Sequence, residues 1–339
     1  MNPDLIITRA HVFTADPAAP RAEAVAVGGS RIMFVGSAAE AESLRGPRTR
    51  LIDAKGRSLL PGLIDSHFHL LWGSVGLADA QLGSVRTLDD LTAAVRKYTD
   101  DHPSADWLTG SGLPYNFLPG GLPLSRHHLD AIIADRPIFV LAYDHHTVWA
   151  NTEALRRANL LRDGATTGPN SEIVIGSDGL ASGELREFGA YDSIKALIPK
   201  PGTAAKRSLL HQGLAQAAAL GITGIHNMNG DAEELALYAA LEDAGELTLR
   251  IYCPYLATPE TPAEALAEAA ALRDEYQSDP SSFDLRSGGS GQGLVRGGAV
   301  KFFMDGVIES GTALLLDDYA DRAGRGDANF SAEHFTRMA

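Results

Sequence analysis

Residues 59–74 read LLPGLIDSHFHLLWGS, and this stretch holds the pattern that decides the fold. An apolar run passes through Pro61-Gly62 and ends on His67-Phe68-His69. In an extended strand, residues i and i+2 point to the same face, so both imidazoles can reach one point at the end of the strand. Neutral imidazole is a common ligand of zinc and similar ions. The alternative is two polar residues at a strand end, each satisfied by hydrogen bonds; the sequence on either side favours the metal.

The sequence after residue 200 alternates helix-like and strand-like segments with short connections. Residues 206–221 have helical spacing, and apolar strand-like segments follow at 221–228, 249–256 and 298–306. Such alternation indicates parallel βα units. Apolar strands that end in polar residues are typical of a (β/α) barrel, whose chemistry lies at the carboxyl ends of the strands. A doubly wound sheet would normally place a glycine-rich phosphate turn after its first strand, where this chain has SHFHLL.

The sequence before the histidine pair reads as short strands. Residues 1–57 therefore predict a small β-unit in front of a larger portion, 58–339, and Gly28-Gly29-Ser30 between two apolar runs indicates a hairpin. Further along, residues 87–102 have helical spacing with acidic residues in the first turn. Asn151 or Thr152 is suited to cap the next helix.

Composition narrows the classes of partner. The chain has 339 residues and a formal net charge of −14, which would repel phosphate backbones, so we expect no nucleic-acid partner. No apolar run of about 18 residues and no secretory signal pattern occur, so no membrane span is expected. The single cysteine, Cys253, fits a reducing cytoplasm.

A lysine, Lys301, lies in the middle of the apolar segment 298–306. A lysine in such a strand is costly unless it is neutralised, paired or used. Burial depresses the pKa of an amine and makes its neutral form reactive. Two interpretations remain open at this point: a functional lysine, or an ion pair with Asp305 or Glu309.

Two further polar groups follow apolar runs. The stretch AYDHHTVWAN (142–151) forms either a polar lip over a pocket or a turn whose histidines face solvent; it contains Asp144, His145, His146 and Trp149. His226 ends the strand-like segment 221–228 and would face the mouth of a barrel. There it would contact substrate, support a ligand residue or bind metal itself.

Other polar features are interpreted as structural. Glu184 and Glu187 could be catalytic acids or the charged start of a helix, and the helix start is preferred. His127-His128 is interpreted as helix surface. The glycine-rich stretch 287–298 lacks Gly-Lys-Ser/Thr and is interpreted as a loop, not a phosphate cradle. No Gly-x-Ser-x-Gly occurs and the only cysteine lies in an apolar strand, so nothing supports serine or cysteine nucleophile chemistry.

Taken together, these motifs resemble the metal-dependent amidohydrolase superfamily. PGLIDSHFH resembles its first barrel strand. The stretches RPIFVLAYDHHTVWANTEAL, SGELRE, GITGIHNM and VKFFMDGVIESGTALL are similar to the YtcJ-like branch, which includes N-substituted formamide deformylases. The resemblance runs over essentially the whole chain.

The resemblance implies an α/β fold: a (β/α)8 TIM-type barrel beside a small β-sandwich built from both ends of the chain. GITGIHNM would be the second barrel strand, which leaves roughly 70–200 as an insertion after the first. VKFFMDG would be the fourth strand. Only four or five barrel strands can be counted in this chain, and a barrel needs eight, so we expect an incomplete barrel.

The resemblance also implies the site. His67 and His69 would bind one or two divalent metal ions, zinc foremost, and Lys301 matches a lysine that many members carboxylate with CO₂ to bridge two metals. The substrate pocket would be shaped by His146, Trp149, His226 and Asp305.

Two departures from the family pattern stand out. The chain has Asp144-His145-His146 where the branch usually shows Asp-Gly-His, which puts the backbone shape of this loop in question. The superfamily also takes two further histidine ligands from the fifth and sixth strands and a general-base aspartate from the eighth. After Lys301 the only histidine is His334, and neither the missing histidine ligands nor the aspartate can be placed in this sequence. We therefore expect the general-base aspartate beyond residue 339.

The expected function is a hydrolase that cleaves an amide or formamide C–N bond of a small molecule with metal-activated water. The alternative is a catalytically inactive, truncated fragment or a half-barrel that binds a partner. A third interpretation is an isomerase or decarboxylase on the same metal barrel. Self-association into a homo-oligomer stays open.

Overall fold

The computed structural model describes residues 2–162, 171–276, 293–308, 311–320 and 323–339. Residues 287–292 of the predicted glycine-rich loop, and Glu309, lie outside this part of the chain. No helix among the described residues is both long and apolar enough to cross a membrane.

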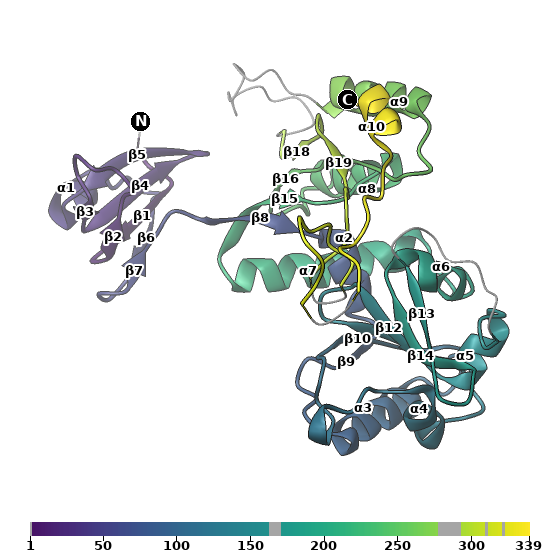
Figure 1. Cartoon of the computed structure of the whole chain (residues 1–339). Helices are drawn as coiled ribbons and strands as arrows, with labels where there is room; N and C mark the ends of the chain where they lie inside the picture. The colour runs from purple at the N-terminus through teal and green to yellow at the C-terminus, as the bar shows by residue number, and fades with distance from the viewer. Residues whose placement is uncertain (1, 163–170, 277–292, 309–310, 321–322) are drawn as a thin grey trace.

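The N-terminal residues form two small sheets, set apart from the rest of the molecule in Figure 1. The first has the order β5-β4-β1-β6, with β1 (Leu5–Thr8), β4 (Ala24–Gly28), β5 (Arg31–Gly36) and β6 (Arg50–Asp53). The second has the order β3-β2-β7, with β2 (His11–Phe13), β3 (Arg21–Ala22) and β7 (Ser58–Leu59). One helix, α1 (Ala38–Ser43), follows β5. The antiparallel β4/β5 pair confirms the predicted hairpin.

Four parallel strands form the sheet that carries the histidine pair. Its order is β18-β16-β15-β8, with β8 (Leu63–Phe68), β15 (Ile222–Asn227), β16 (Arg250–Tyr252) and β18 (Val295–Arg296). Just beyond β16 and β18, a second parallel pair forms from β17 (Tyr255–Ala257) and β19 (Val300–Phe302). Strands that lie side by side in this sheet also follow one another along the chain, as they do in a barrel. In a doubly wound sheet, by contrast, the strand order reverses at one point. The described residues supply four such strands and no closed barrel.

Helices cover one face of this sheet. They are α2 (Leu70–Gly76), α7 (Thr203–Ala219), α8 (Ala232–Asp243) and α9 (Leu266–Tyr276), with a short 3₁₀ turn η2 (Ala263–Ala265) before α9. The last helix, α10 (Ala332–Met338), packs instead in a small core with residues of β17 and β19. Leu210 and Tyr238 from these helices pack with Ile225 and Ile251 from the strands, and Phe68 packs against the same core. Because side chains alternate along a strand, His67 and His226 lie on the opposite face.

Between α2 and α7 the chain forms a second, six-stranded sheet in the order β13-β14-β12-β11-β10-β9. We call this part of the chain, residues 77–202, the insertion; Figure 1 shows it as a lobe of its own below α2 and α7. Its strands are β9 (Ala80–Gln81), β10 (Leu108–Leu113), β11 (Ile138–Ala142), β12 (Thr147–Ala150), β13 (Glu172–Ile175) and β14 (Ala181–Arg186). Its helices are α3 (Leu88–Asp101), η1 (Pro119–Gly121), α4 (Arg126–Ile132), α5 (Thr152–Arg157) and α6 (Phe188–Lys195).

Helix starts in the insertion follow the predicted signals. Thr87 accepts a hydrogen bond from Asp90 N, while the Asp90 carboxylate accepts one from Thr87 N, which makes a capping box for α3. Asn151 is the residue that caps α5, through its side-chain oxygen and Ala154 N. Both caps satisfy backbone donors that would otherwise lack a partner.

The insertion begins and ends at helices that pack on each other. The chain leaves the four-stranded sheet through α2 and returns to it through α7, and the two helices are in contact. They approach closely at Gly213, where a Cβ atom would lie 2.1 Å from Ser74 Oγ. The two points where the insertion joins the rest of the chain are therefore held together.

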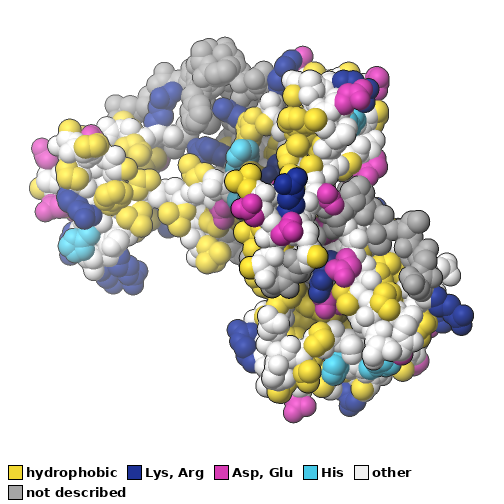
Figure 2. All heavy atoms as spheres, viewed as in Figure 1, with side chains coloured by type: hydrophobic (Ala, Val, Ile, Leu, Met, Phe, Trp, Pro, Cys, Tyr) yellow, Lys and Arg dark blue, Asp and Glu magenta, His cyan; other side chains and the backbone are white. Residues whose placement is uncertain are grey.

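Several apolar side chains are exposed near β8 and on the N-terminal unit. Ile64 of β8 is 77% exposed and Leu220, after α7, is 70% exposed. Figure 2 shows hydrophobic side chains gathered on the N-terminal unit. The exposed apolar residues of β5 in this unit are Ile32, Met33 and Val35. Contiguous exposed apolar patches are typical of surfaces that bind another polypeptide, a membrane or a ligand.

Gly183 of β14 gives the first testable prediction. Its φ is +106°, and a Cβ there would lie 2.6 Å from Arg126 N and 2.7 Å from Ala150 O. Gly183→Ala is expected to lower the free energy of unfolding by about 2 kcal/mol, because both contacts are with backbone and the conformation disfavours a side chain. Urea titration followed by tryptophan fluorescence measures the change.

A matched control is Gly179→Ala. Gly179 also has a positive φ, +76°, but a Cβ there would meet no atom within 4 Å. It should cost only the backbone strain, about 1 kcal/mol. Equal losses for the two variants would contradict the close-approach argument.

Candidate functional site

The two histidines of the opening motif lie at the carboxyl end of β8. His67 is in the strand and His69 is the residue before α2. Their ring centroids are 5.5 Å apart and the ring planes make an angle of 65°. Phe68 between them packs into the helix-covered core. The two imidazoles therefore lie beside each other on the face away from the helices.

His69 is held in a defined way by Asn229, which follows β15. The ring Nδ1 of His69 donates to the side-chain oxygen of Asn229. Burial lowers the pKa of His69, the hydrogen bond to Asn229 works in the opposite direction, and the charges of His67 and Lys301 lower the pKa further. His69 is thereby kept in the neutral form, which is the form that binds metals.

Lys301 lies on β19, which pairs with β17 just beyond the four-stranded sheet. Phe302, the next residue, packs against Phe330 in a small core, so strand alternation turns Lys301 the other way. Its ammonium nitrogen is 4.8 Å from the centre of the Phe303 ring. Because its charge acts on His69, Lys301 belongs to the same electrostatic environment.

Asp305, a predicted pocket residue, instead orders its own loop. Its carboxylate accepts a hydrogen bond from Leu314 N at 2.9 Å. Among the described residues it forms no ion pair with Lys301. The loop bond gives Asp305 a structural role in this arrangement.

His226 lies on the inner face of β15. It is paired in register with Tyr252 of β16, and the two rings make an edge contact at 4.9 Å. It therefore shares a face with His67, as the strand-end pattern predicts.

An aromatic stack links the histidine pair to the insertion. The His69 ring stacks on Trp72 at 5.3 Å, and Trp72 stacks on His145 at 5.9 Å. The ammonium of Lys195 lies 4.8 Å from the centre of the Trp72 ring. Trp72 was not predicted as a site residue, although its position three residues after His69 places it on the same side of the first turn of α2.

The loop with two adjacent histidines splits their roles. His145, in the β11–β12 turn with φ +68°, joins the stack, whereas His146 Nδ1 contacts Glu187 Oε2 at 2.8 Å. Glu187 is buried, with 6% of its surface exposed. Its second carboxylate oxygen, Oε1, accepts a hydrogen bond from Thr312 Oγ1. The turn thus sends one histidine toward the four-stranded sheet and the other toward a buried carboxylate.

The interpretation of Glu184 and Glu187 as a charged helix start is corrected here. Glu184 lies on β14 and pairs with Arg186. Glu187 does precede α6, but it is buried and has a φ of +64°. A buried carboxylate with a histidine partner is a candidate functional group, which agrees with the alternative of a catalytic acid for Glu187. Its partner lies 41 positions away, so no local pattern signals the pair.

Trp149, another predicted pocket residue, lies in the core of the insertion. Its side chain on β12 is 4% exposed, and it packs edge-on against Tyr115 at 5.4 Å. Its neighbours are the apolar residues of the sheet and of α3 and α4. The structure therefore gives it a packing role and does not bring it to the histidine pair.

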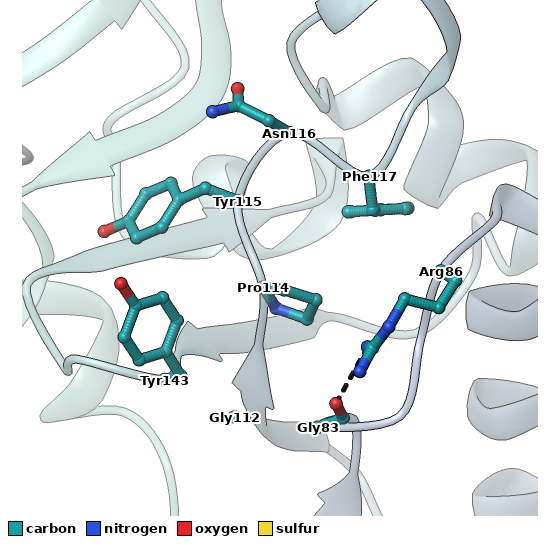
Figure 3. A pocket seen from close by; sticks show the side chains of 8 residues that line it. All are labelled: Gly83, Arg86, Gly112, Pro114, Tyr115, Asn116, Phe117 and Tyr143. Atoms are coloured by element: carbon teal, nitrogen blue, oxygen red, sulfur yellow. Dashed lines mark hydrogen bonds between the residues drawn. The ribbon is translucent and has the colours of Figure 1, made fainter.

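A separate cavity of about 450 Å³ opens on the insertion (Figure 3). It is lined by Gly83, Arg86, Gly112, Pro114, Tyr115, Asn116, Phe117 and Tyr143. The Arg86 guanidinium donates to Gly83 O at 2.9 Å, and Tyr115 donates to the Asp144 carboxylate at 3.1 Å. None of the predicted site residues lines it.

The side chains at the histidine pair meet the needs of a metal ion only in part. Among the described residues, no group of three or more His, Cys, Asp or Glu side chains is arranged to hold one. The histidine pair fits two coordination positions, since Asn229 occupies Nδ1 of His69 and leaves Nε2 as the ligand atom. Lys301 is the one further predicted ligand among the described residues. These residues therefore supply part of a metal site and not a complete set of ligands.

Comparison with known proteins agrees with these features. The family model described as "Amidohydrolase family" matches residues 50–339. The chain is 26% identical to an N-substituted formamide deformylase of Arthrobacter pascens and 26% identical to the protein YtcJ of Bacillus subtilis (strain 168), in each case over 314 residues. Each match covers 91% of this chain and 55% of the relative. The chain thus spans about half the length of these curated relatives.

A solved structure shares the fold. The uncharacterized metal-dependent hydrolase from Pyrococcus furiosus superimposes with a TM-score of 0.64 at 20% sequence identity. The superposition covers 98% of this chain and 64% of that one. At this identity the likeness concerns the fold alone.

Proposed function

This chain belongs to the amidohydrolase family, and we propose that it forms the first half of the active site of a metal-dependent hydrolase. The observation that carries the proposal is the histidine pair at the end of β8. His67 and His69 lie beside each other, and Asn229 occupies Nδ1 of His69. Nε2 of His69 is then free of its proton and suited to bind a metal ion.

The proposed reaction is hydrolysis of an amide or formamide C–N bond in a small molecule, supported by the similarity to the formamide deformylase. A divalent metal, zinc foremost, would polarise the carbonyl group and lower the pKa of water. His67 and His69 hold it, with Lys301, carboxylated or not, as a further ligand. His226 and His146 orient the substrate, while Trp72 closes the site against the insertion.

The described residues supply only part of the proposed site. Four parallel strands are described, and a barrel has eight. We propose that the remaining ligands and the general-base aspartate belong to the other four strands. The described strands would then bind the metal and orient the substrate. The other four strands would supply the base that removes the proton from water.

Metal analysis tests the proposal directly. The purified chain, loaded with zinc and then dialysed, is expected to retain about one or two metal ions per chain, since the two imidazoles lie beside each other. A His67→Ala/His69→Ala variant should lose them. Elemental analysis measures the content.

The control is His11→Ala/His127→Ala, which removes the same number of imidazoles from exposed positions on β2 and α4. It should keep its metal. If the wild-type chain holds none, or if both double variants lose it equally, the proposed metal site is wrong.

A second candidate function is a half-barrel that binds a complementing polypeptide. The observation that favours it is the exposed apolar surface around β8, an edge strand, with Ile64 and Leu220 more than two-thirds exposed. Ultracentrifugation distinguishes it: a self-associating chain whose association Ile64→Asp abolishes would support this candidate, and a monomer at all concentrations would argue against self-pairing.

A further inference from the structure

Behind the histidine pair lies a buried polar network that the proposed mechanism does not use. It consists of Asn227, Asn229, Glu234 and Tyr238, all nearly or fully buried. We propose that Glu234 is a positioning residue: acting through Asn229, it decides which nitrogen of the His69 ring carries the proton. This inference rests on the proposed function in one respect, that His69 is a metal ligand.

The first step is the orientation of Asn227. Leu70 N donates to the Asn227 side-chain oxygen at 2.9 Å, so that oxygen is engaged by backbone. The Asn227 amide nitrogen must then point the other way, and it donates to Glu234 Oε1 at 2.9 Å. Backbone geometry therefore sets which end of this amide faces Glu234.

The second step is the orientation of the Tyr238 hydroxyl. Its oxygen accepts from Leu71 N at 3.1 Å, and its proton is donated to Glu234 Oε1 at 2.5 Å. Glu234 Oε1 consequently receives two donors. Neither donor can be reversed while Leu70 N and Leu71 N hold Asn227 and Tyr238 in place.

The third step reaches the site. The other carboxylate oxygen, Oε2, accepts from the Asn229 amide nitrogen at 3.4 Å. Since an ionised carboxylate can only accept, Asn229 turns its nitrogen toward Glu234 and its oxygen toward His69. The Asn229 oxygen in turn requires a proton on His69 Nδ1. The lone pair is then left on Nε2.

The burial of Glu234 supports a specific role. Its side chain is 5% exposed, and among the described residues it forms no ion pair with Lys, Arg or His. A buried acid without a cationic partner is costly, and its place in the first turn of α8 offsets only part of that cost. A neutral glutamine at this position would cost less free energy to bury. It would, however, present a donor as well as an acceptor, whereas the carboxylate presents acceptors only.

The test is Glu234→Gln at pH 8. Glutamine must keep its oxygen toward Asn227 and Tyr238, which both donate, so its amide nitrogen faces Asn229. Asn229 then turns over, presents its own nitrogen to His69, and moves the His69 proton to Nε2. Zinc affinity, measured by chelator competition, is expected to fall 10- to 100-fold.

A second readout does not need metal. In ¹⁵N-histidine-labelled, metal-free protein, the His69 signal, assigned by its loss in His69→Ala, should show the Nδ1–H tautomer in the wild type and the Nε2–H tautomer in Glu234→Gln. The matched control is Glu233→Gln, on the same helix, where Glu233 is 64% exposed and pairs with Lys206. It should change neither readout.

Rescue separates positioning from mere packing. In Glu234→Gln/Asn229→Asp, the new carboxylate accepts from the glutamine nitrogen on one side and from His69 Nδ1 on the other. Zinc affinity and the Nδ1–H tautomer should both return toward the wild type. An unchanged tautomer in Glu234→Gln, or loss without rescue, would overturn the inference. A wild-type chain that binds no zinc but shows the tautomer switch would overturn only the proposed metal function.

Discussion

Asn151→Ala is expected to lower the free energy of unfolding of the insertion by about 3–5 kcal/mol, the sum of a lost helix cap and several unpaired backbone groups. The Asn151 oxygen accepts from Ala154 N and from Ile138 N, at 3.0 and 2.9 Å. Its nitrogen donates to Ile133 O and Arg136 O, at 3.1 and 2.8 Å. One fully buried side chain thus serves α5, β11 and the loop after α4.

The measurement is urea unfolding followed by tryptophan fluorescence, since Trp107 and Trp149 are both buried in the insertion. Thr152→Ala is the matched control. Thr152 Oγ1 makes one hydrogen bond, to Asp130, so its loss should cost about 1 kcal/mol. If the two variants lost the same stability, Asn151 would be an ordinary cap and the wider role assigned to it would be wrong.

Replacement of Glu234 by glutamine is expected to change the pH dependence of stability by up to about 3 kcal/mol in metal-free protein. Burial raises the pKa of Glu234 from 4.5 to about 7, while hydrogen bonds from Tyr238 and Asn227 work in the opposite direction. The folded state therefore holds this proton more tightly than the unfolded state does. Its contribution to stability is complete below about pH 4.5 and is lost as the pH rises through about 7.

Denaturant unfolding at pH 5 and pH 8 measures this effect. Relative to Glu234→Gln, the wild type should become less stable as the pH rises between these values. Glu233→Gln should track the wild type at both, because Glu233 is exposed. A wild type and Glu234→Gln variant that differ by the same amount at pH 5 and pH 8 would rule out a raised pKa.

Local patterns predicted much of the fold. The β4/β5 hairpin, the start of α3 at Thr87 and the cap at Asn151 all depend on residues within a few positions of one another. The same is true of His67 and His69, whose spacing alone turns both rings to one face of β8. Short-range geometry of this kind is legible in a sequence.

The parts that sequence did not predict depend on distant residues. Asn229 lies 160 positions from His69, and Glu187 lies 41 positions from His146, so no spacing rule connects either pair. Trp149 shows the converse: it lies in a polar-looking stretch, yet the six-stranded sheet buries it. Tertiary packing decides such cases, because it alone determines which side chains meet.

The contact between α2 and α7 has a consequence for how this protein can evolve. The helices α2 and α7 are in contact and approach closely at Ser74 and Gly213. The chain therefore enters and leaves the insertion, residues 77–202, at neighbouring points. Lineages can therefore lengthen, shorten or exchange this segment without changing the register of β8 against β15. Changes in the insertion are thereby separated from the strands that carry the histidines, so this architecture can vary one while preserving the other.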